Sequence, residues 1–312
     1  MLFDLIGKAS RLLALLLICG LIAALSPSFL TPGNLLNVLR QASLLAIIAT
    51  GMTLTMLIAG IDLSVGSILA LSSCVAAQFL LERNSIEITL LGVLVALGGG
   101  ALLGFINGLV VAKLKLPAFL VTFGMMQVAR GLAYIYMRGT VFNGFKKEFE
   151  FIGAGSLFGV PMPIVLAAVL VAMVFFLLNG TTFGRSIYGI GANLSAARYS
   201  GLSIPRTTVL VYTLSGLIAA LAGLIYIARL DTAEAQIGEN FALQAIGAAA
   251  IGGTSFDGGL GSLAGTVIGA LILTVITNGM NLLNISSLWQ TFVTGAAIVI
   301  AVVVDRWVSG KS

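Results

Sequence analysis

The sequence predicts an all-α polytopic membrane protein with about ten transmembrane segments and an inverted internal repeat. Of the 312 residues, 59% are hydrophobic and only 9% are charged, whereas a soluble domain is usually about a quarter charged. In hydrocarbon, only helices or closed barrels satisfy the backbone. The apolar runs lack the alternation of barrel strands. The 38 glycines suit close helix packing in lipid.

The apolar segments form one predicted transmembrane domain over residues 1–312. Several are shorter than the roughly 20 residues of a full span. The shortest is rich in Ala and Gly, so we expect it to be broken or buried among other helices. The segments are Leu12–Leu25, Ala42–Ala59, Val65–Leu81, Ile88–Val111, Ala118–Tyr136, Ile164–Leu178, Thr208–Ala228, Phe241–Gly252, Leu263–Asn278 and Leu288–Val304.

The first segment is expected to be a retained helix. Met1–Leu25 has a short charged start and an apolar run, so a cleaved signal peptide is the alternative. No convincing small-x-small cleavage site follows, and Ser26-Pro27 is typical of a helix end. Cys19 and Cys74 lie inside apolar runs, and we expect both to be small apolar fillers rather than a disulfide.

The distribution of positive charge predicts the orientation. With ten crossings both ends lie on one side, and an excess of Lys and Arg favours the cytoplasm for that side. That side would hold Lys8, Arg11, Lys113, Lys115, Arg185, Arg198, Arg206, Arg306 and Lys311, and the other side Arg40, Arg83, Arg138, Lys146, Lys147 and Arg229. The acids Glu82, Glu87, Glu148, Glu150, Asp231, Glu234 and Glu239 fall outside. The stretch 179–207 is then cytoplasmic.

A short pattern occurs twice. Asn107-Gly108 closes the fourth segment and Asn278-Gly279 closes the ninth, each followed by Val-Thr about fifteen residues later. The topology places the first turn in the cytoplasm and the second outside. This predicts an inverted repeat with halves at about 42–137 and 207–305, and a substrate path between the halves.

The motif Gly60–Ser67 joins the second and third segments. Asp62 is costly at membrane depth unless it caps a helix or pairs. It can be the N-cap of the third helix, with Ser64 as the alternative, while Gly60 and Gly66 permit a tight turn and close packing. We interpret the motif as a structural joint, and an ion or substrate site is the alternative.

A glycine-rich stretch over 252–262 raises the question of a phosphate loop. It contains Gly252, Gly253, Gly258 and Gly259 but lacks the Lys-Ser/Thr ending and a preceding strand. We interpret it as a flexible cytoplasmic hairpin between broken helices. The chain has no histidine, so the sequence offers no catalytic triad and no metal site, and an enzyme is not expected. The net charge of +5 is too small to suggest nucleic acid.

The longest interruption of the apolar sequence is Asn179–Thr207, which carries three arginines and no acid. Asn193 can cap a short helix, and Gly201 can end it in the left-handed conformation. Pro205 suits the first turn of the next helix. The short helix needs a partner, which from the residues alone is either this chain's own helix ends or a second protein.

Polar residues inside the apolar segments are the remaining candidates for a transport path. In lipid such residues either join helices or line a wet path. As a set without buried acids, they suit a neutral, hydrogen-bonding solute better than a proton- or sodium-driven carrier. The candidates are Asn107, Thr122, Gln127, Asn278, Asn281 and Thr294, with Arg130 and Gln290 nearby in such segments.

Four motifs together resemble one known family. Gly60–Ser67, Gly184–Leu202, Gly252–Ala270 and Asn278–Leu283 are similar to the membrane permease of ribose-type ABC sugar importers, and the similarity runs from about Ser26 to Asp305. The resemblance implies a bacterial inner-membrane subunit that pairs with a second permease copy, in a homodimer or a heterodimer. It also implies a cytoplasmic ATPase that binds the ATP, with no cofactor on this chain, and a periplasmic or lipid-tethered sugar-binding protein.

In such importers a central cytoplasmic helix docks in a groove of the ATPase. The resemblance places this coupling role on Gly184, Arg185, Asn193, Ala196, Ala197, Arg198 and Gly201. Because Ala197 is small and lies mid-helix, we expect it to face the partner. The alternatives are a branched-chain amino-acid ABC permease, a secondary transporter and a membrane enzyme. The motifs do not select the sugar.

Overall fold

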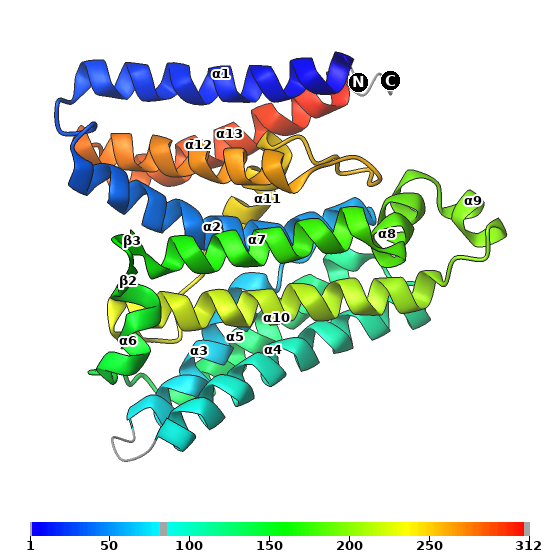
Figure 1. Ribbon diagram of the computed structural model, residues 1–312. Coiled ribbons are helices and arrows are strands. Elements are labelled where there is room, and N and C mark those ends of the chain that lie inside the picture. The colour runs from blue at the N-terminus through cyan, green and yellow to red at the C-terminus, as the bar shows by residue number, and fades with distance from the viewer. Residues whose placement is uncertain (1, 82–85, 309–312) are drawn as a thin grey trace.

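A computed structural model describes residues 2–81 and 86–308 as a bundle of helices (Figure 1). Glu82, Arg83 and Lys311 of the charge distribution lie outside the described residues. The helices are α1 Leu2–Leu25, α2 Pro32–Leu57, α3 Val65–Leu81, α4 Ile86–Leu114, α5 Ala118–Met137, α6 Lys147–Ala154, α7 Met162–Gly180, α8 Thr182–Ala192, α9 Leu194–Tyr199, α10 Ile204–Leu230, α11 Phe241–Ile251, α12 Leu263–Leu282 and α13 Ser287–Val308.

Every predicted apolar segment coincides with a helix. By length and composition, six of the described helices can cross a membrane: α2, α4, α5, α7, α10 and α12. The apolar stretches within α1, α3, α11 and α13 are shorter. The sequence did not predict α6, α8 or the four two-residue strands β1 Phe142–Asn143, β2 Ser156–Leu157, β3 Val160–Pro161 and β4 Thr232–Ala233. β1 pairs with β4 and β2 with β3, both antiparallel.

Local sequence explains several helix boundaries. Proline lies in the first turn of α2, α7 and α10, where its missing N–H and fixed φ suit a helix start. Pro205 has the predicted position. The Ser262 hydroxyl accepts from the amide of Gly265 and caps α12. α1 ends at Leu25, before Ser26-Pro27 as predicted.

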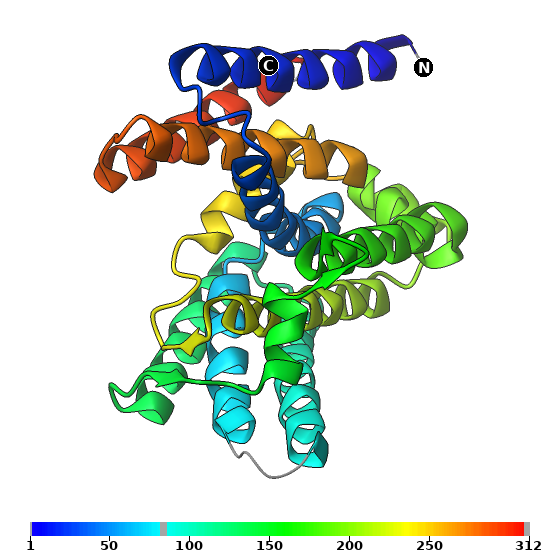
Figure 2. The same ribbon diagram turned by 60° about the vertical axis from the view of Figure 1, so that its left-hand side comes forward.

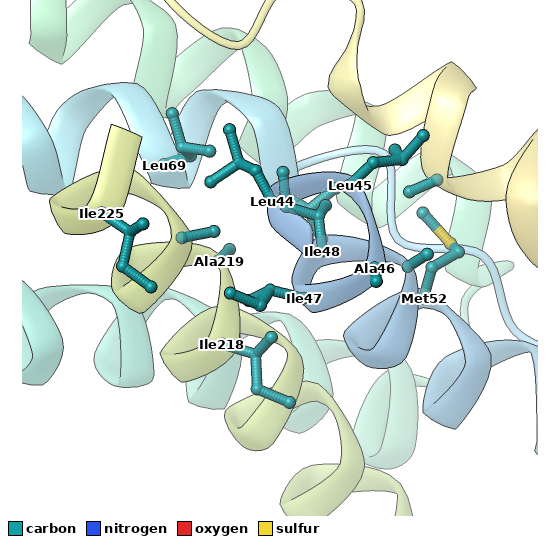
Figure 3. Close-up of a cluster of buried hydrophobic side chains, with 14 of the residues drawn as sticks. Leu44, Leu45, Ala46, Ile47, Ile48, Met52, Leu69, Ile218, Ala219 and Ile225 are labelled. Carbon is teal, nitrogen blue, oxygen red and sulfur yellow. The ribbon is translucent and has the colours of Figure 1, made fainter. Parts of the chain in front are cut away.

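The core forms around α2 and α10. Ile47 and Ile48 of α2 face Ile218 and Ile225 of α10, with Leu69 of α3 above them (Figure 3). The apolar stretches of α2, α10 and α12 are about two-thirds buried, whereas those of α4, α5 and α7 are only about one-fifth buried. The outer helices therefore present apolar side chains away from the protein, as a lipid-facing layer requires.

The two ends of the bundle carry different elements. The start of α1, the end of α13, the α11–α12 connection and the pair α8–α9 all lie at one end (Figure 1). α6, β2 and β3 lie at the opposite end, and the turned view places α6 across that end (Figure 2). The start of α1, the end of α13 and the α8–α9 segment therefore lie at the same end of the bundle.

Candidate functional site

A cleft of about 310 Å³ opens between α2, α10, α11 and α12, with one residue from α13. A second cavity of about 430 Å³ adjoins it, because both are lined by Gln244, Thr277 and Thr294. The other hydrogen-bonding side chains of the first cavity are Gln41, Tyr226, Arg229 and Thr274, and the second adds Asn240, Gln290 and Thr291.

Two aromatic rings stand in the wall of the cleft. Tyr226 of α10 and Phe241 of α11 pack edge to face, with ring centroids 5.6 Å apart. None of the described residues that line the two cavities is a carboxylate. Amides, hydroxyls, one guanidinium group and aromatic faces suit a small solute with several hydroxyl groups. Amides and hydroxyls donate and accept hydrogen bonds and the guanidinium group donates them, while the aromatic faces offer apolar contact.

The predicted path residues separate into different places. Of the six, Thr294 lines the cleft. Asn278 is buried and exchanges two hydrogen bonds of 2.9 and 3.0 Å with Asn34, which joins α12 to the start of α2. Asn281 is exposed and accepts from the Gln290 amide over 2.6 Å, and Gln127 is exposed on α5.

Sequence reasoning missed most of the polar lining. Gln41 precedes the predicted start of its segment, and Gln244 is the one amide in the Ala-rich stretch Phe241–Gly252. An amide alone in an apolar stretch is a usable signal, since it must pair or face water. Tyr226 and Phe241 gave no signal, because aromatic residues are common in ordinary cores.

The remaining two predicted path residues, Asn107 and Thr122, lie at the joint between α2 and α3. The Thr122 hydroxyl accepts from the Leu63 amide over 3.1 Å. The Asn107 amide group donates to the Ser64 hydroxyl over 2.9 Å. Both side chains are fully buried. They hold the joint and do not reach the cleft lining.

Asp62 is the centre of this joint. One carboxylate oxygen accepts from the amide and the hydroxyl of Ser64, and the other accepts from the Ser215 hydroxyl of α10 over 2.8 Å. The side chain is fully buried. Hydrogen bonds from three donors satisfy a carboxylate that is shielded from solvent. Asp62 thus connects the α2–α3 joint to the middle of α10.

Glycine makes the close packing at the joint possible. A methyl group at Gly60 would overlap the Tyr212 hydroxyl, and one at Gly66 would overlap the carbonyl oxygen of Gly238. The Tyr212 hydroxyl and the side-chain oxygen of Asn107 are buried without a hydrogen-bond partner among the described residues.

The segment between α7 and α10 contains two helices. In α9, the Asn193 side chain accepts from the Ala196 amide over 2.9 Å, and Gly201 follows with φ of +76°. Both features agree with the predicted capped helix. Arg185, Ala196 and Arg198 are exposed, whereas Gly184 is buried, and a methyl there would overlap the Leu178 carbonyl.

Ala197 differs from the expectation. Its side chain is 4% exposed and packs within its own chain, so it does not present a surface to a partner. The large exposed apolar side chains of α9 are Leu194 and Tyr199, and Tyr199 is 91% exposed. Helix α9 has fewer than two turns, so its facing could not be fixed from spacing.

The base of this segment is fixed by backbone contacts. The Gly259 amide donates to the Leu57 carbonyl over 2.9 Å. A methyl at Gly191 would overlap that same carbonyl oxygen, and one at Gly258 would overlap Ala59. Burial raises the pKa of Tyr188, so its hydroxyl stays protonated and donates to the Gly261 carbonyl over 3.1 Å. The 252–262 stretch is thus a packed connection rather than a free hairpin.

Gly252 and Gly253 lie at the other end of this connection. A methyl at Gly252 would run into the backbone of Gly265 at the start of α12, and Gly253 has φ of +80° and lies against the Arg11 guanidinium group of α1. The glycines of the 252–262 stretch therefore allow α1, the end of α2, α8 and the start of α12 to approach this connection closely.

Comparison with known proteins identifies the family. Residues 34–302 match the family described as branched-chain amino acid transport system / permease component. The chain belongs to this permease family. Named relatives include the ribose import permease protein RbsC of Escherichia coli (strain K12), which is 43% identical over 304 residues, covering 96% of this chain and 94% of the relative.

Two further relatives cover most of the permease. The ribose import permease protein RbsC of Bacillus subtilis (strain 168) is 42% identical over 301 residues, which is 96% of this chain and 92% of the relative. The D-allose transport system permease protein AlsC of Escherichia coli (strain K12) is 38% identical over 305 residues, 97% and 92% of the two chains. No solved structure matches the permease. The family match and the six helices that are long and apolar enough to cross a membrane together show that the chain is a multi-pass membrane protein.

Proposed function

We propose that this permease is the transmembrane subunit of an ATP-driven importer that carries a monosaccharide-like solute delivered by a binding protein. The observation that carries the proposal is the cleft lined by amides, hydroxyls and an aromatic pair, without a carboxylate among its described lining residues. Relatives named for ribose and D-allose support a sugar as the solute.

The proposal includes an inverted repeat and ten crossings. α2 packs on α11 and α12, and α10 packs correspondingly on α3 and α4. α3 packs on α4 and α5, as α11 packs on α12 and α13. α4 ends near α8, whereas α12 ends at the opposite end of the bundle (Figure 1). This reciprocal packing supports α2–α5 and α10–α13 as repeats of opposite direction.

The cleft follows from that arrangement. Its walls come from α2 of the first half and from α10, α11, α12 and α13 of the second. In transporters built from inverted repeats, solute sites lie between the halves, and a tilt of one half against the other opens the path to alternate sides. The tentative path residue Thr294 keeps its role in the proposal, and Gln41, Gln244 and Thr277 join it.

The end with α8 and α9 is proposed to face the cytoplasm of a bacterial inner membrane. Arg185 and Arg198 are exposed at this end, which agrees with the excess of positive charge in cytoplasmic loops. Here α9 would dock on a separate ATPase subunit that binds the ATP, and this chain would carry no cofactor. Tyr199 and Leu194 supply an exposed apolar contact of the kind that anchors interfaces.

Three further partners belong to the proposal. A second permease copy, identical or not, and membrane lipid would cover the exposed faces of the outer helices, and a periplasmic or lipid-tethered sugar-binding protein would dock at the α6 end. Nucleic acid is not a proposed partner.

Two other transport functions remain as alternatives. A branched-chain amino acid would need groups for both of its charges, and the cleft offers the guanidinium group of Arg229 for its carboxylate. A secondary transporter would need an ion site on its path. Asp62 is the buried acid closest to that description, but its hydrogen bonds hold the α2–α3 joint and it does not line the cleft.

Reconstitution tests the proposal. The permease, its ATPase and its binding protein are placed in proteoliposomes, and ATP-dependent uptake of D-ribose, D-allose and L-leucine is measured. We expect sugar uptake, and no ATP hydrolysis by the permease alone. Gln244→Ala should lower uptake roughly fivefold, since one hydrogen bond contributes about 1 kcal/mol. Gln78→Ala, which removes an exposed amide outside the cleft, is the matched control. Uptake of leucine without any sugar would favour the amino-acid alternative.

A further inference from the structure

The hairpin of β2 and β3 carries an unusual residue at its tip. Ser156 pairs with Pro161 and Leu157 with Val160, so Phe158 and Gly159 form a two-residue turn. Both have positive φ, +50° and +81°. Such turns favour Asn, Asp and Gly, because a side chain is crowded in the left-handed conformation. A large aromatic residue at the first position is unfavourable for the turn itself.

The same residue is not packed against the protein. The Phe158 side chain is 98% exposed, so no contact with another described residue offsets the backbone strain. Leu157, Val160 and Phe151 are also exposed, and the Phe151 ring lies against Gly155 at the base of the hairpin. The tip is therefore an apolar patch on a strained turn, which needs a partner outside the chain.

The position of the hairpin indicates the partner. Pro161 is followed directly by α7, whose 19 residues extend about 28 Å and so match the hydrocarbon thickness of roughly 30 Å. α7 exposes Val169, Met173 and Phe176 along its length. No charged residue lies between Glu150 and Arg185. The hairpin is thus continuous with a helix that is long and apolar enough to cross a membrane, at the point where that helix begins.

We propose that this hairpin is an interfacial anchor, with Phe158 inserted among the lipid head groups and upper acyl chains of the leaflet at the α6 end. Aromatic side chains are enriched at that level of the bilayer. Burial in lipid gives the exposed ring the apolar surroundings that the protein does not provide. Counting back from the hairpin, the first charged residues are Glu150, Glu148 and Lys147 of α6, and the exposed Lys147 can lie near lipid phosphates.

The anchor has a consequence for the transport cleft. Phe149 and Gly153 of α6 face inward, and a methyl at Gly153 would overlap the backbone of Arg229 at the end of α10. Arg229 also lines the cleft. Because α6 connects directly to the hairpin, lipid contact at Phe158 would hold this end of α10 at a fixed depth.

Fluorescence quenching in nanodiscs tests the anchor on the full chain. Trp289 and Trp307 are replaced by Phe, and one tryptophan is introduced by Phe158→Trp. The control is Tyr199→Trp, which places the same probe on an equally exposed site at the opposite end. We expect lipids brominated near the head group to quench the Phe158→Trp probe at least twofold more than the control. Aqueous acrylamide should show the reverse order.

Two results would overturn the proposal. One is equal acrylamide quenching of both probes with no effect of brominated lipid, which would place the hairpin in water. The other is shielding of the Phe158→Trp probe only after a binding protein is added, which would make the tip a protein contact. Both quenching measurements are made without transport, so the test of the anchor can fail or succeed whether or not the proposed function is correct.

Discussion

The amide of Gly259 donates a hydrogen bond to the carbonyl oxygen of Leu57 over 2.9 Å, which joins the α11–α12 connection to the end of α2. Gly191 of α8 lies against the same carbonyl. Three elements far apart in the sequence thus meet through their backbones. Close-packed backbones cannot move independently, so we expect a displacement of α8–α9 to reach the α2–α3 joint and the start of α12.

Replacing Gly191 tests this junction. Gly191→Ala adds a methyl that overlaps the Leu57 carbonyl, whereas a methyl at Gly189 would meet the flexible Leu202 side chain at 3.3 Å. We expect Gly191→Ala to lower the free energy of unfolding by about 1–3 kcal/mol, as overpacking does, despite the better helix propensity of Ala. Gly189→Ala on the same helix is the matched control. Thermal unfolding in detergent and uptake in proteoliposomes are the measurements, and equal values for the two variants would refute the junction.

Docking through Tyr199 gives the second prediction. The side chain is 91% exposed, so Tyr199→Ala should leave the thermal unfolding of the isolated permease unchanged. It should weaken ATPase binding roughly thirtyfold, since truncating an aromatic anchor costs about 2 kcal/mol. Ser200→Ala, at the next exposed position, is the control. The measurement is the affinity of each variant for the purified ATPase. If Tyr199→Ala binds the ATPase as tightly as the wild type does, Tyr199 is not part of the interface.

Ala197→Glu should behave differently from these surface variants. Ala197 is buried in its own chain, and a buried unpaired charge costs several kcal/mol. We expect this variant to lower the melting temperature or the yield of the isolated permease. A variant that folds normally and loses only ATPase binding would show that Ala197 meets the partner after all.

The α8–α9 segment shows what local sequence can predict. The cap at Asn193 and the left-handed Gly201 are local features, so α9 could be derived from its own residues. α8 could not, because Gly184, Gly189 and Gly191 disfavour a helix. Gly191 permits contact with the carbonyl of Leu57, which is a tertiary contact, whereas Gly184 permits a tight local turn against the carbonyl of Leu178 at the end of α7. Tertiary packing therefore overrides propensity here.

The cleft shows a second limit. Segment positions follow from hydrophobicity, and all ten were placed on helices. Rotation about each helix axis depends on neighbours that the sequence does not name, so the sequence alone does not show that Asn278 pairs with Asn34. Its neighbour Thr277 lines the cleft. A step of one residue along a helix turns the side-chain direction by about 100°. This rotation is why Thr277 lines the cleft while Asn278 contacts Asn34 instead.

The Asp62 joint allows a graded stability test. Asp62→Ala removes the acceptor for the Ser64 amide, the Ser64 hydroxyl and the Ser215 hydroxyl. Each buried donor without a partner costs about 1–3 kcal/mol. Ser215→Ala removes one donor and leaves Asp62 its bonds from Ser64, so it should destabilise by about 1–2 kcal/mol, clearly less than Asp62→Ala. Thermal unfolding of both variants in the same detergent is the measurement. Equal stability of Asp62→Ala and wild type would show that the carboxylate does not hold the joint.

The last prediction separates path residues from helix contacts. In a background with Cys19 and Cys74 replaced by Ala, Thr277→Cys should react with a water-soluble maleimide, because Thr277 lines both cavities. Asn278→Cys, one residue along α12, should stay unreactive, because Asn278 is buried against Asn34. Gel filtration and thermal unfolding confirm that each variant is folded.

Labelling is then repeated with the ATPase bound, with and without nucleotide. Opening and closing of a path between the halves changes water access at its lining, so reactivity at Thr277→Cys should differ between the two conditions. Two path positions predicted from the sequence that lie outside the cleft lining are tested alongside by Gln127→Cys and Asn281→Cys. If Asn278→Cys reacts and Thr277→Cys does not, the path runs instead along the contact between α2 and α12. Water would then have to reach the position where Asn278 meets Asn34 for the reagent to label it.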